Sequence, residues 1–157
     1  MIVESRNLNQ ENQPNGTNST YLMMTESKKS NLDVVHGPTI TERKSTFQGH
    51  VCRVTEVSQV EEFLADLTGR NKIANAKHNI LAYRIGSDKF KIIEGFDSDG
   101  EKRGAEPVMH LLRVLDLTNV AVVVTRWYGG IFLRSDRYKC IRTAAQHALI
   151  AGGFIKE

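Results

Sequence analysis

The chain has 157 residues, with 21 lysines and arginines against 18 aspartates and glutamates, and therefore a net charge of +3. This length suits one domain with or without a tail, and the charge is too small to indicate nucleic-acid binding by itself. No apolar run reaches the roughly 18 residues of a membrane helix, and the N-terminus lacks the apolar stretch of a signal peptide. Two distant cysteines, Cys52 and Cys140, suit reduced thiols, so we expect a soluble, cytoplasmic protein with no membrane role.

The first 35 residues differ in composition from the rest. They are rich in Asn, Gln, Ser and Thr and contain a single aromatic residue, Tyr21. Such a segment cannot bury enough apolar surface to offset the entropy that it would lose on ordering. We therefore predict a disordered polar tail over residues 1–35, dispensable for folding, and a globular domain over residues 36–157.

The globular domain opens with a strand pattern and a helix pattern. Residues 47–52 alternate between apolar and polar side chains, which is the period of a half-buried strand. Apolar residues then recur at helical spacing from Val57 to Leu67. Thr55 is a suitable N-cap for this helix, and Gly69 suits its end.

Two strands and a second helix follow. Residues 79–85 and 90–96 are predicted strands, and Gly86-Ser87-Asp88 between them fits a hairpin turn. After an acidic loop at residues 97–101, a helix is expected to begin near Pro107, where a missing N–H costs nothing. The apolar stripe of this helix consists of Val108, Leu111, Leu112 and Leu115.

The last third of the chain completes the predicted fold. Residues 120–124 are an unbroken run of Val and Ala, which predicts a strand buried on both faces. Ser135 can cap a final helix that stops at Gly152-Gly153. The inner face of this helix consists of Tyr138, Ile141, Ala145 and Leu149. The order of elements predicts an α/β (α+β) two-layer sandwich with a mixed sheet and helices on one face.

The segment from Thr125 to Ile131 carries the strongest indication of a contact surface. It places Arg126, Trp127 (the only tryptophan) and Tyr128 directly after the buried strand. Gly129-Gly130 then allows a sharp turn or a close backbone approach. Because strand side chains alternate, Tyr128 should point away from Trp127. Trp127 can therefore belong to the core while Tyr128 faces a partner.

The acidic loop allows two interpretations. Asp97, Asp99 and Glu101 stand at alternate positions and offer oxygen ligands for a hard cation. An EF-hand loop needs Gly at its sixth position and Glu at its twelfth, whereas Gly100 is fourth and Val108 twelfth when counted from Asp97. We therefore favour a solvated turn that assists the next helix, or a recognition surface, over a metal site.

Basic residues surround the predicted last helix. They are Arg126, Arg134, Arg137, Lys139 and Arg142, against the single acid Asp136. Beside Trp127 and Tyr128 they could follow a phosphate backbone while a ring stacks a base, although an ordinary solvated helix gives the same pattern. Neither G-x-G-x-x-G nor the P-loop pattern is present, so the sequence carries no nucleotide-binding signature.

Catalytic signatures are lacking in the sequence. No pair among the histidines (His36, His50, His78, His110 and His147) has metal-ligand spacing with a third ligand nearby. His78 precedes a strand, where a structural hydrogen bond is the expected role. Neither cysteine has a histidine at a spacing that would activate a thiolate. We therefore expect no enzyme activity, no metal and no cofactor.

Seven short motifs occur in order through the globular part. They are His36-Gly37-Pro38, RKSTFQ at residues 43–48, Lys72-Ile73-Ala74, His78-Asn79-Ile80, Asp99-Gly100-Glu101, His110-Leu111-Leu112 and RWYGGI at residues 126–131. Together they resemble the ancient domain of the IMPACT family from about His36 to Gly153, and Asp136-Arg137 with Lys139 also resembles the family pattern. The resemblance implies a fold like that of a small-subunit ribosomal protein and of translational GTPases.

The resemblance also implies a function and its partners. Eukaryotic members restrain the general-control kinase during amino-acid starvation by competing for its ribosome-associated activator. The family is further associated with actin, and bacterial members with nucleic acid. Much of the activator binding belongs to an N-terminal RWD domain, for which the 35 residues before this domain are too few and too polar.

From the sequence we predict a non-enzymatic regulator of translation that acts by protein–protein contact in the general-control kinase pathway. Its expected contact surface consists of Asp97, Asp99, Glu101, Arg126, Trp127, Tyr128 and Arg137. The alternative is an RNA- or ribosome-binding module that uses the basic last helix. Two departures from the family pattern are Glu106-Pro107, for Gly or Ala, and Arg134-Ser135, for Gly-Pro. A positive φ is difficult for arginine, so the second change can alter the turn.

Overall fold

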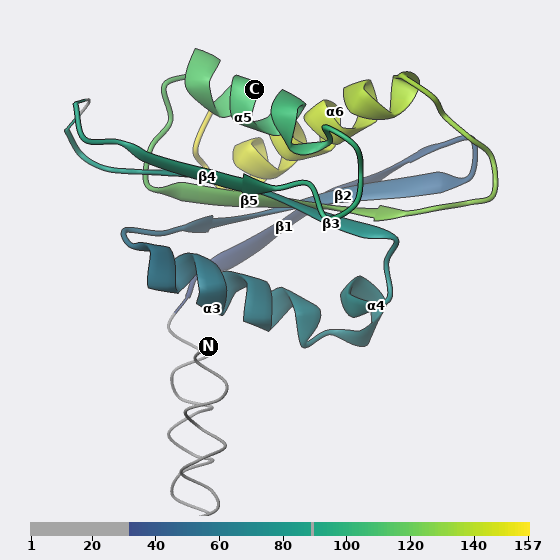
Figure 1. The fold of residues 1–157 in the computed structure, drawn as a ribbon, viewed down its shortest axis with the longest axis horizontal. Helices are drawn as coiled ribbons and strands as arrows, with labels where there is room; N and C mark the ends of the chain where they lie inside the picture. The colour runs from purple at the N-terminus through teal and green to yellow at the C-terminus, as the bar shows by residue number, and fades with distance from the viewer. Residues whose placement is uncertain (1–31, 89) are drawn as a thin grey trace, which may run out of the picture. The chain divides into compact units, whose positions relative to one another are not determined.

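The computed structural model describes residues 32–88 and 90–157, which contain a five-stranded sheet and four helices (Figure 1). The strands, in spatial order, are β1 (Val34–Glu42), β2 (Ser45–Arg53), β5 (Val120–Trp127), β3 (His78–Ile85) and β4 (Ile93–Asp97). The helices are α3 (Val57–Thr68), α4 (Asn71–Ala74), α5 (Ala105–Val114) and α6 (Asp136–Ala151). The predicted tail lies outside the described residues except for residues 32–35, of which Val34 and Val35 already belong to β1.

The predicted α+β class is confirmed, but two details of the prediction were wrong. Every neighbouring pair of strands in the described sheet is antiparallel, so the sheet is not mixed. Helices α5 and α6 lie on one face, and α3 and α4 lie on the other, which gives three layers instead of two (Figure 1). The central strand β5 explains this arrangement, because a strand buried on both faces needs cover on both.

Each face of β5 contributes to its own hydrophobic core. Val120, Val122 and Val124 pack against α5 and α6, together with Phe47 and Ile80 from the neighbouring strands. On the other face, Ala121 and Val123 pack against α3 and α4. The rest of that second core is Cys52, Val54, Val60, Phe63, Leu67, Ile73, Leu81 and Ile85.

Most predicted helix ends are close to the observed ones, although capping differs. The N-cap of α3 is Glu56, one residue after the predicted Thr55, because the Thr55 N–H instead donates to the side chain of Gln59. Gly69 ends α3 as predicted. Ser135 occupies the N-cap position of α6, but its side chain makes no capping hydrogen bond.

Two predicted apolar elements differ in extent. The second strand of the hairpin begins at Ile93 and not at residue 90, and the Lys91 N–H before it donates to the Asp88 carbonyl. Helix α5 begins at Ala105, so Pro107 is its third residue. Leu115 follows the end of α5 and is 40% exposed, so it does not complete the buried stripe.

Helix α6 approaches β1 and β2 very closely because small residues meet there. A Cβ atom added at Gly49 would lie 2.4 Å from the carbonyl oxygen of Ala144 and 2.8 Å from the Ala148 methyl. A Cβ atom at Gly37 would lie 2.9 Å from the Ala148 Cα atom. Glycine on the strands therefore fixes the position of α6. Among the described residues, no helix combines the length and the hydropathy needed to cross a membrane.

Candidate functional site

The end of β5 places its last side chains on opposite faces of the sheet, as predicted. Trp127 packs against the α3 and α4 core, and its ring N–H donates to the Lys72 carbonyl at 2.9 Å. Arg126 and Tyr128 lie on the α5 and α6 face, where the Arg126 guanidinium carbon is 5.7 Å from the Tyr128 ring centre. The turn beyond β5 therefore presents Tyr128, and not Trp127, on the α6 side.

Gly129 and Gly130 each serve one of the two expected purposes. A Cβ atom at Gly129 would lie 1.9 Å from the Lys44 carbonyl oxygen, so only glycine lets the two backbones approach this closely. Gly130 has φ +96°, which turns the chain toward α6. The turn ends at Leu133, which is 1% exposed and belongs to the α5 and α6 core.

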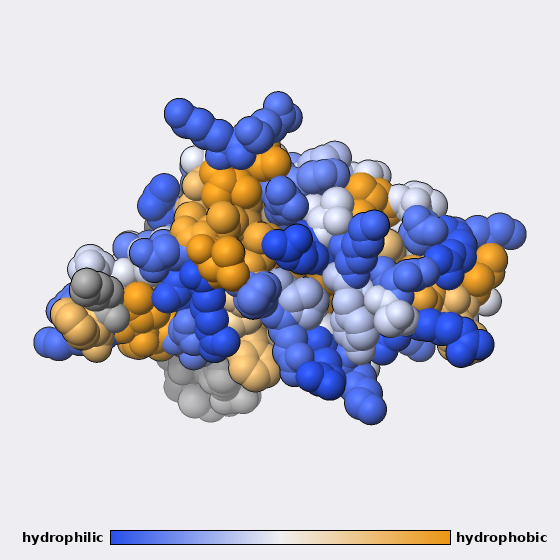
Figure 2. Space-filling view, turned by 90° about the horizontal axis from the view of Figure 1, so that it is seen from above, coloured by the Kyte–Doolittle hydropathy of each residue, from blue (hydrophilic) through white to orange (hydrophobic). Residues whose placement is uncertain are grey.

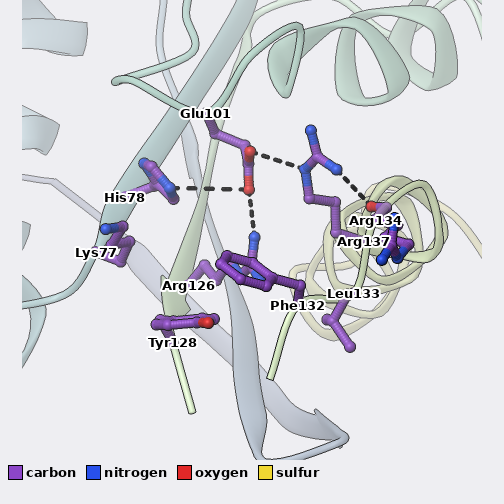
Figure 3. A pocket seen from close by; sticks show the side chains of 9 residues that line it. All are labelled: Lys77, His78, Glu101, Arg126, Tyr128, Phe132, Leu133, Arg134 and Arg137. Atoms are coloured by element: carbon purple, nitrogen blue, oxygen red, sulfur yellow. Dashed lines mark hydrogen bonds and ion pairs between the residues drawn. The ribbon is translucent and has the colours of Figure 1, made fainter. Parts of the chain in front are cut away.

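A pocket of about 390 Å³ opens between this turn, the start of β3 and the first turn of α6 (Figure 3). Its lining residues are Lys77, His78, Glu101, Arg126, Tyr128, Phe132, Leu133, Arg134 and Arg137. This volume lies in the range of small-molecule sites. The pocket therefore brings together residues from five separate parts of the sequence.

Glu101 is the centre of the pocket's ion-pair network. One of its carboxylate oxygens lies 2.6 Å from Nη1 of Arg126, and the other lies 2.9 Å from Nε of Arg137. Nε2 of His78 lies 3.8 Å from the same carboxylate (Figure 3). Glu101 and Arg126 are only 5% and 6% exposed. Three residues of the predicted surface therefore lie together, but two of them are buried.

The acidic loop is exposed at Asp97 and Asp99, as predicted for a solvated turn, and it is also bonded to β3. Asp99 accepts the Asn79 N–H through its carboxylate at 2.7 Å, and its carbonyl accepts the ring N–H of His78 at 2.8 Å. Asp97 accepts the Asp99 N–H at 2.8 Å. These bonds confirm the structural role predicted for His78, and a left-handed turn at Asp99 and Gly100 directs Glu101 inward. No group of three or more His, Cys, Asp or Glu residues in the described part of the chain is arranged to hold a metal ion.

An exposed apolar surface adjoins the pocket. Phe132 is 78% exposed, Ile131 43% and Tyr128 38%. The Tyr128 and Phe132 rings are in contact, with centroids 5.8 Å apart. The view onto α5 and α6 in Figure 2 shows such apolar groups bordered by hydrophilic ones at the end where β5 leads into α6. We define Tyr128, Ile131, Phe132 and Arg134 as the β5–α6 surface.

Sequence reasoning did not assign several of these pocket residues to the site. Nothing in the sequence pattern around Lys77 or Leu133 indicated a binding site, since single lysines and leucines are common in loops. Phe132 lies in a turn without periodicity, so its exposure was not predictable. Arg134 was part of the predicted basic cluster but not of the predicted surface. The structure gives Arg134 φ +54°, so it adopts the left-handed conformation that the family glycine would favour.

On the opposite face of β5, a chain of hydrogen bonds between side chains runs from the exposed His36 inward to the buried His50 and Thr125. Nδ1 of His36 lies 2.8 Å from Nδ1 of His50, and Nε2 of His50 lies 2.9 Å from the Thr125 hydroxyl. That hydroxyl donates to the Asn79 side-chain oxygen at 2.7 Å, and the Asn79 amide donates to the Ile73 carbonyl. Since Thr125 donates to Asn79, it accepts from His50, and His50 in turn accepts from His36. Each group in this chain therefore has a partner.

Reactive thiols are absent from the described residues. Burial raises the pKa of Cys52 to about 11 and also raises the pKa of Cys140 above its ordinary value. Both sulfurs therefore stay protonated at neutral pH, and a thiol is a weak nucleophile.

Comparison with known proteins identifies the domain that carries this site. The Impact N-terminal domain family model matches residues 43–149, which is more than half of the chain. The chain belongs to the IMPACT family. Protein IMPACT of Rattus norvegicus is 44% identical over 122 residues, which cover 77% of this chain and 38% of the rat protein. The Homo sapiens protein is 45% identical over 116 residues, covering 73% of this chain and 36% of its own length.

One solved structure supports the family assignment, and a second one supports the fold. The structure of Yih1, described as a two-domain translational regulator, matches with a TM-score of 0.55 and 34% identity, covering 74% of this chain and 46% of Yih1. A hypothetical protein matches with a TM-score of 0.66 and 24% identity, covering 74% of this chain and 56% of its own, which shows the fold alone. The IMPACT-family chain described here spans little more than a third of the length of its curated relatives.

Proposed function

We propose that this IMPACT-family domain regulates translation without catalysis, by binding a protein of the general-control kinase pathway. The proposal is supported by the likeness to Yih1, a translational regulator, and by the exposed apolar side chains of the β5–α6 surface. The partner that we propose is the ribosome-associated activator of the kinase, with actin as the alternative.

The single observation that supports protein contact is the exposure of Phe132 beside Tyr128. An aromatic ring that is 78% exposed places its apolar face in water, and burying it against a partner is favourable. Aromatic and arginine side chains dominate the free energy of many protein interfaces. Arg134 lines the same pocket as this pair, so a positive charge adjoins the apolar centre.

The structure changes which residues of the predicted surface can touch a partner. Glu101 and Arg126 are buried, and Arg137 is bonded to Glu101, so substitution of these three would disturb the fold. Tyr128 and Phe132 are more informative, because truncating them leaves the ion pairs of the pocket in place.

Affinity capture from starved and fed cells tests this proposal, with and without nuclease. We expect Tyr128→Ala combined with Phe132→Ala to weaken capture of the activator at least tenfold, about 1.4 kcal/mol. The melting temperature should stay within a few degrees, since exposed positions change stability by about 0.5 kcal/mol. Phe96→Ala is the matched control, because this aromatic is 64% exposed on β4, outside the β5–α6 surface. Full capture by the double variant would exclude this surface.

RNA or ribosome binding is the second candidate, and the cations that line the pocket favour it. Lys77, Arg126, Arg134 and Arg137 line the pocket together with a single carboxylate, Glu101. Capture that is lost after nuclease treatment, and that falls steeply with salt, would favour this candidate over direct protein contact, because phosphate contacts release counterions.

A further inference from the structure

The pocket holds more positive charge than its own residues compensate. Four cations, Lys77, Arg126, Arg134 and Arg137, line it together with one carboxylate, Glu101. That carboxylate is shared by Arg126 and Arg137. No acidic side chain within residues 32–88 and 90–157 forms an ion pair with Lys77 or Arg134. The pocket therefore favours an anionic ligand.

Arg126 also has a buried donor without an acceptor. Its Nη1 atom bonds Glu101, whereas its Nε atom is buried and has no hydrogen-bond partner among the described residues. Buried N–H groups without acceptors are uncommon in folded proteins. Among acceptors, an oxyanion suits a guanidinium best, because it can engage two donors at once.

The conformation of Arg134 gives a third indication. This arginine has φ +54°, a conformation that costs free energy for a side chain other than glycine. Its carbonyl accepts a hydrogen bond from Nη1 of Arg137, which ties this turn to the first turn of α6 at the edge of the pocket (Figure 3). Backbone strain of this kind is common where a ligand is held.

The aromatic pair determines which kind of anion suits the pocket. Tyr128 and Phe132 lie on the side of the pocket opposite Glu101 (Figure 3). Nζ of Lys77 lies 5.8 Å from the Tyr128 ring centre, so a cation and an apolar plane adjoin each other. A planar heterocycle can stack on such a wall while an attached anion reaches the cations.

We propose that this pocket binds a nucleoside monophosphate. Its phosphate contacts Lys77, Arg126 and Arg134, and its base stacks on the outer face of Phe132. The site uses side-chain cations, which is why neither of the glycine-rich phosphate motifs is needed. This proposal goes beyond the translational role and does not depend on it, since binding is measured with the chain alone.

Titration of the full chain at low salt tests the site, with AMP, ribose 5-phosphate and inorganic phosphate as probes. We expect all three to bind and AMP to bind at least tenfold more tightly than ribose 5-phosphate, because only AMP offers a ring for stacking. Phe132→Ala should abolish this difference and leave the affinity for inorganic phosphate unchanged.

Arg134→Gly isolates the charge from the fold, because glycine favours the positive φ at this position. We expect this variant to bind AMP at least tenfold more weakly while its melting temperature is equal or higher. Arg142→Gln is the matched control, since it removes one exposed positive charge from α6 outside the pocket lining. Its affinity for AMP should stay within about twofold of the wild type.

Three results would overturn the proposal. The first is absence of binding by AMP and phosphate at millimolar concentration. The second is an equal loss of affinity in Arg142→Gln and Arg134→Gly, which would show attraction to net charge only. The third is binding of an RNA oligonucleotide without binding of AMP, which would favour the RNA module instead.

Discussion

Two polar clusters lie back to back on the central strand, and they differ in charge and in access to solvent. Thr125 and Arg126 are neighbours on β5, but Thr125 points toward α3 and α4 and Arg126 toward α5 and α6. Around Thr125, every group is neutral and bonded to the next one. Around Arg126, charged groups meet at Glu101, and positive charge remains in excess.

The difference shows how buried polar groups separate into structural and ligand-binding sets. A closed neutral chain satisfies its own donors and acceptors, so it specifies the packing of four strands and has no further capacity to bind. A charged cluster that lines a pocket keeps cations without a counter-charge, so it can bind an anion. The first set is therefore expected to affect stability alone, and the second to affect stability and binding.

The largest expected effect comes from neutralising Glu101. Glu101→Gln keeps the shape of the side chain but leaves the buried Arg126 guanidinium without a counter-charge, which typically costs about 3–5 kcal/mol. Urea unfolding measures this loss. Glu106→Gln is the control, because its ion pair with Arg103 is exposed and its removal should leave the unfolding midpoint unchanged. A Glu101→Gln variant of full stability would show that water compensates Arg126.

An intermediate effect is expected from lowering the pH. Burial, followed by the neighbouring His36, lowers the pKa of His50 to about 3, from an ordinary value near 6.5. The unfolded chain therefore takes up this proton first, so stability decreases as the pH falls below about 6.5 and stops decreasing near 3. Between pH 7 and pH 5 the loss should be about 2 kcal/mol. His50→Gln should flatten this dependence, and an unchanged slope would assign it to other groups.

The smallest effect is expected at Thr125. Thr125→Val removes the hydroxyl that bridges His50 and Asn79, and leaves the buried His50 ring and the half-buried Asn79 side chain without this partner, at a cost of about 1 kcal/mol or somewhat more. Thr125→Ser keeps the hydroxyl and should preserve most of the stability. AMP binding should be unchanged in both variants, because the pocket is on the other face. A loss of AMP affinity would show that the two clusters are coupled through β5.

The sequence predicted local structure well wherever a pattern repeats. The run at residues 120–124 predicted a strand buried on both faces, and the alternation beyond it predicted the opposite directions of Trp127 and Tyr128. The same run also requires cover on both faces, a consequence that the predicted two-layer arrangement did not include. Layer number depends on where α3 packs, and a helical period does not encode that.

The candidate site was predictable only in part, because burial is decided by contacts that are remote in sequence. Glu101 lies in an acidic loop, where solvated side chains are the rule, and only its approach to Arg126 and Arg137 explains its burial. Lys77 belongs to the pocket because β3 begins beside the end of β5. The basic residues around the last helix were evident from the sequence, but only Arg126, Arg134 and Arg137 of them line the pocket.

The close seam between α6 and the first two strands links packing to electrostatics. Ala144 and Ala148 of α6 pack directly against Gly49. A methyl group added at Gly49 would therefore push the helix away from the sheet. Arg137 is about two turns before Ala144 on the same helix. A displacement of α6 at Ala144 would therefore also move the Arg137 guanidinium relative to Glu101. The lack of a side chain at Gly49 thus determines the position of α6, and through it the distance between Arg137 and Glu101 in the pocket.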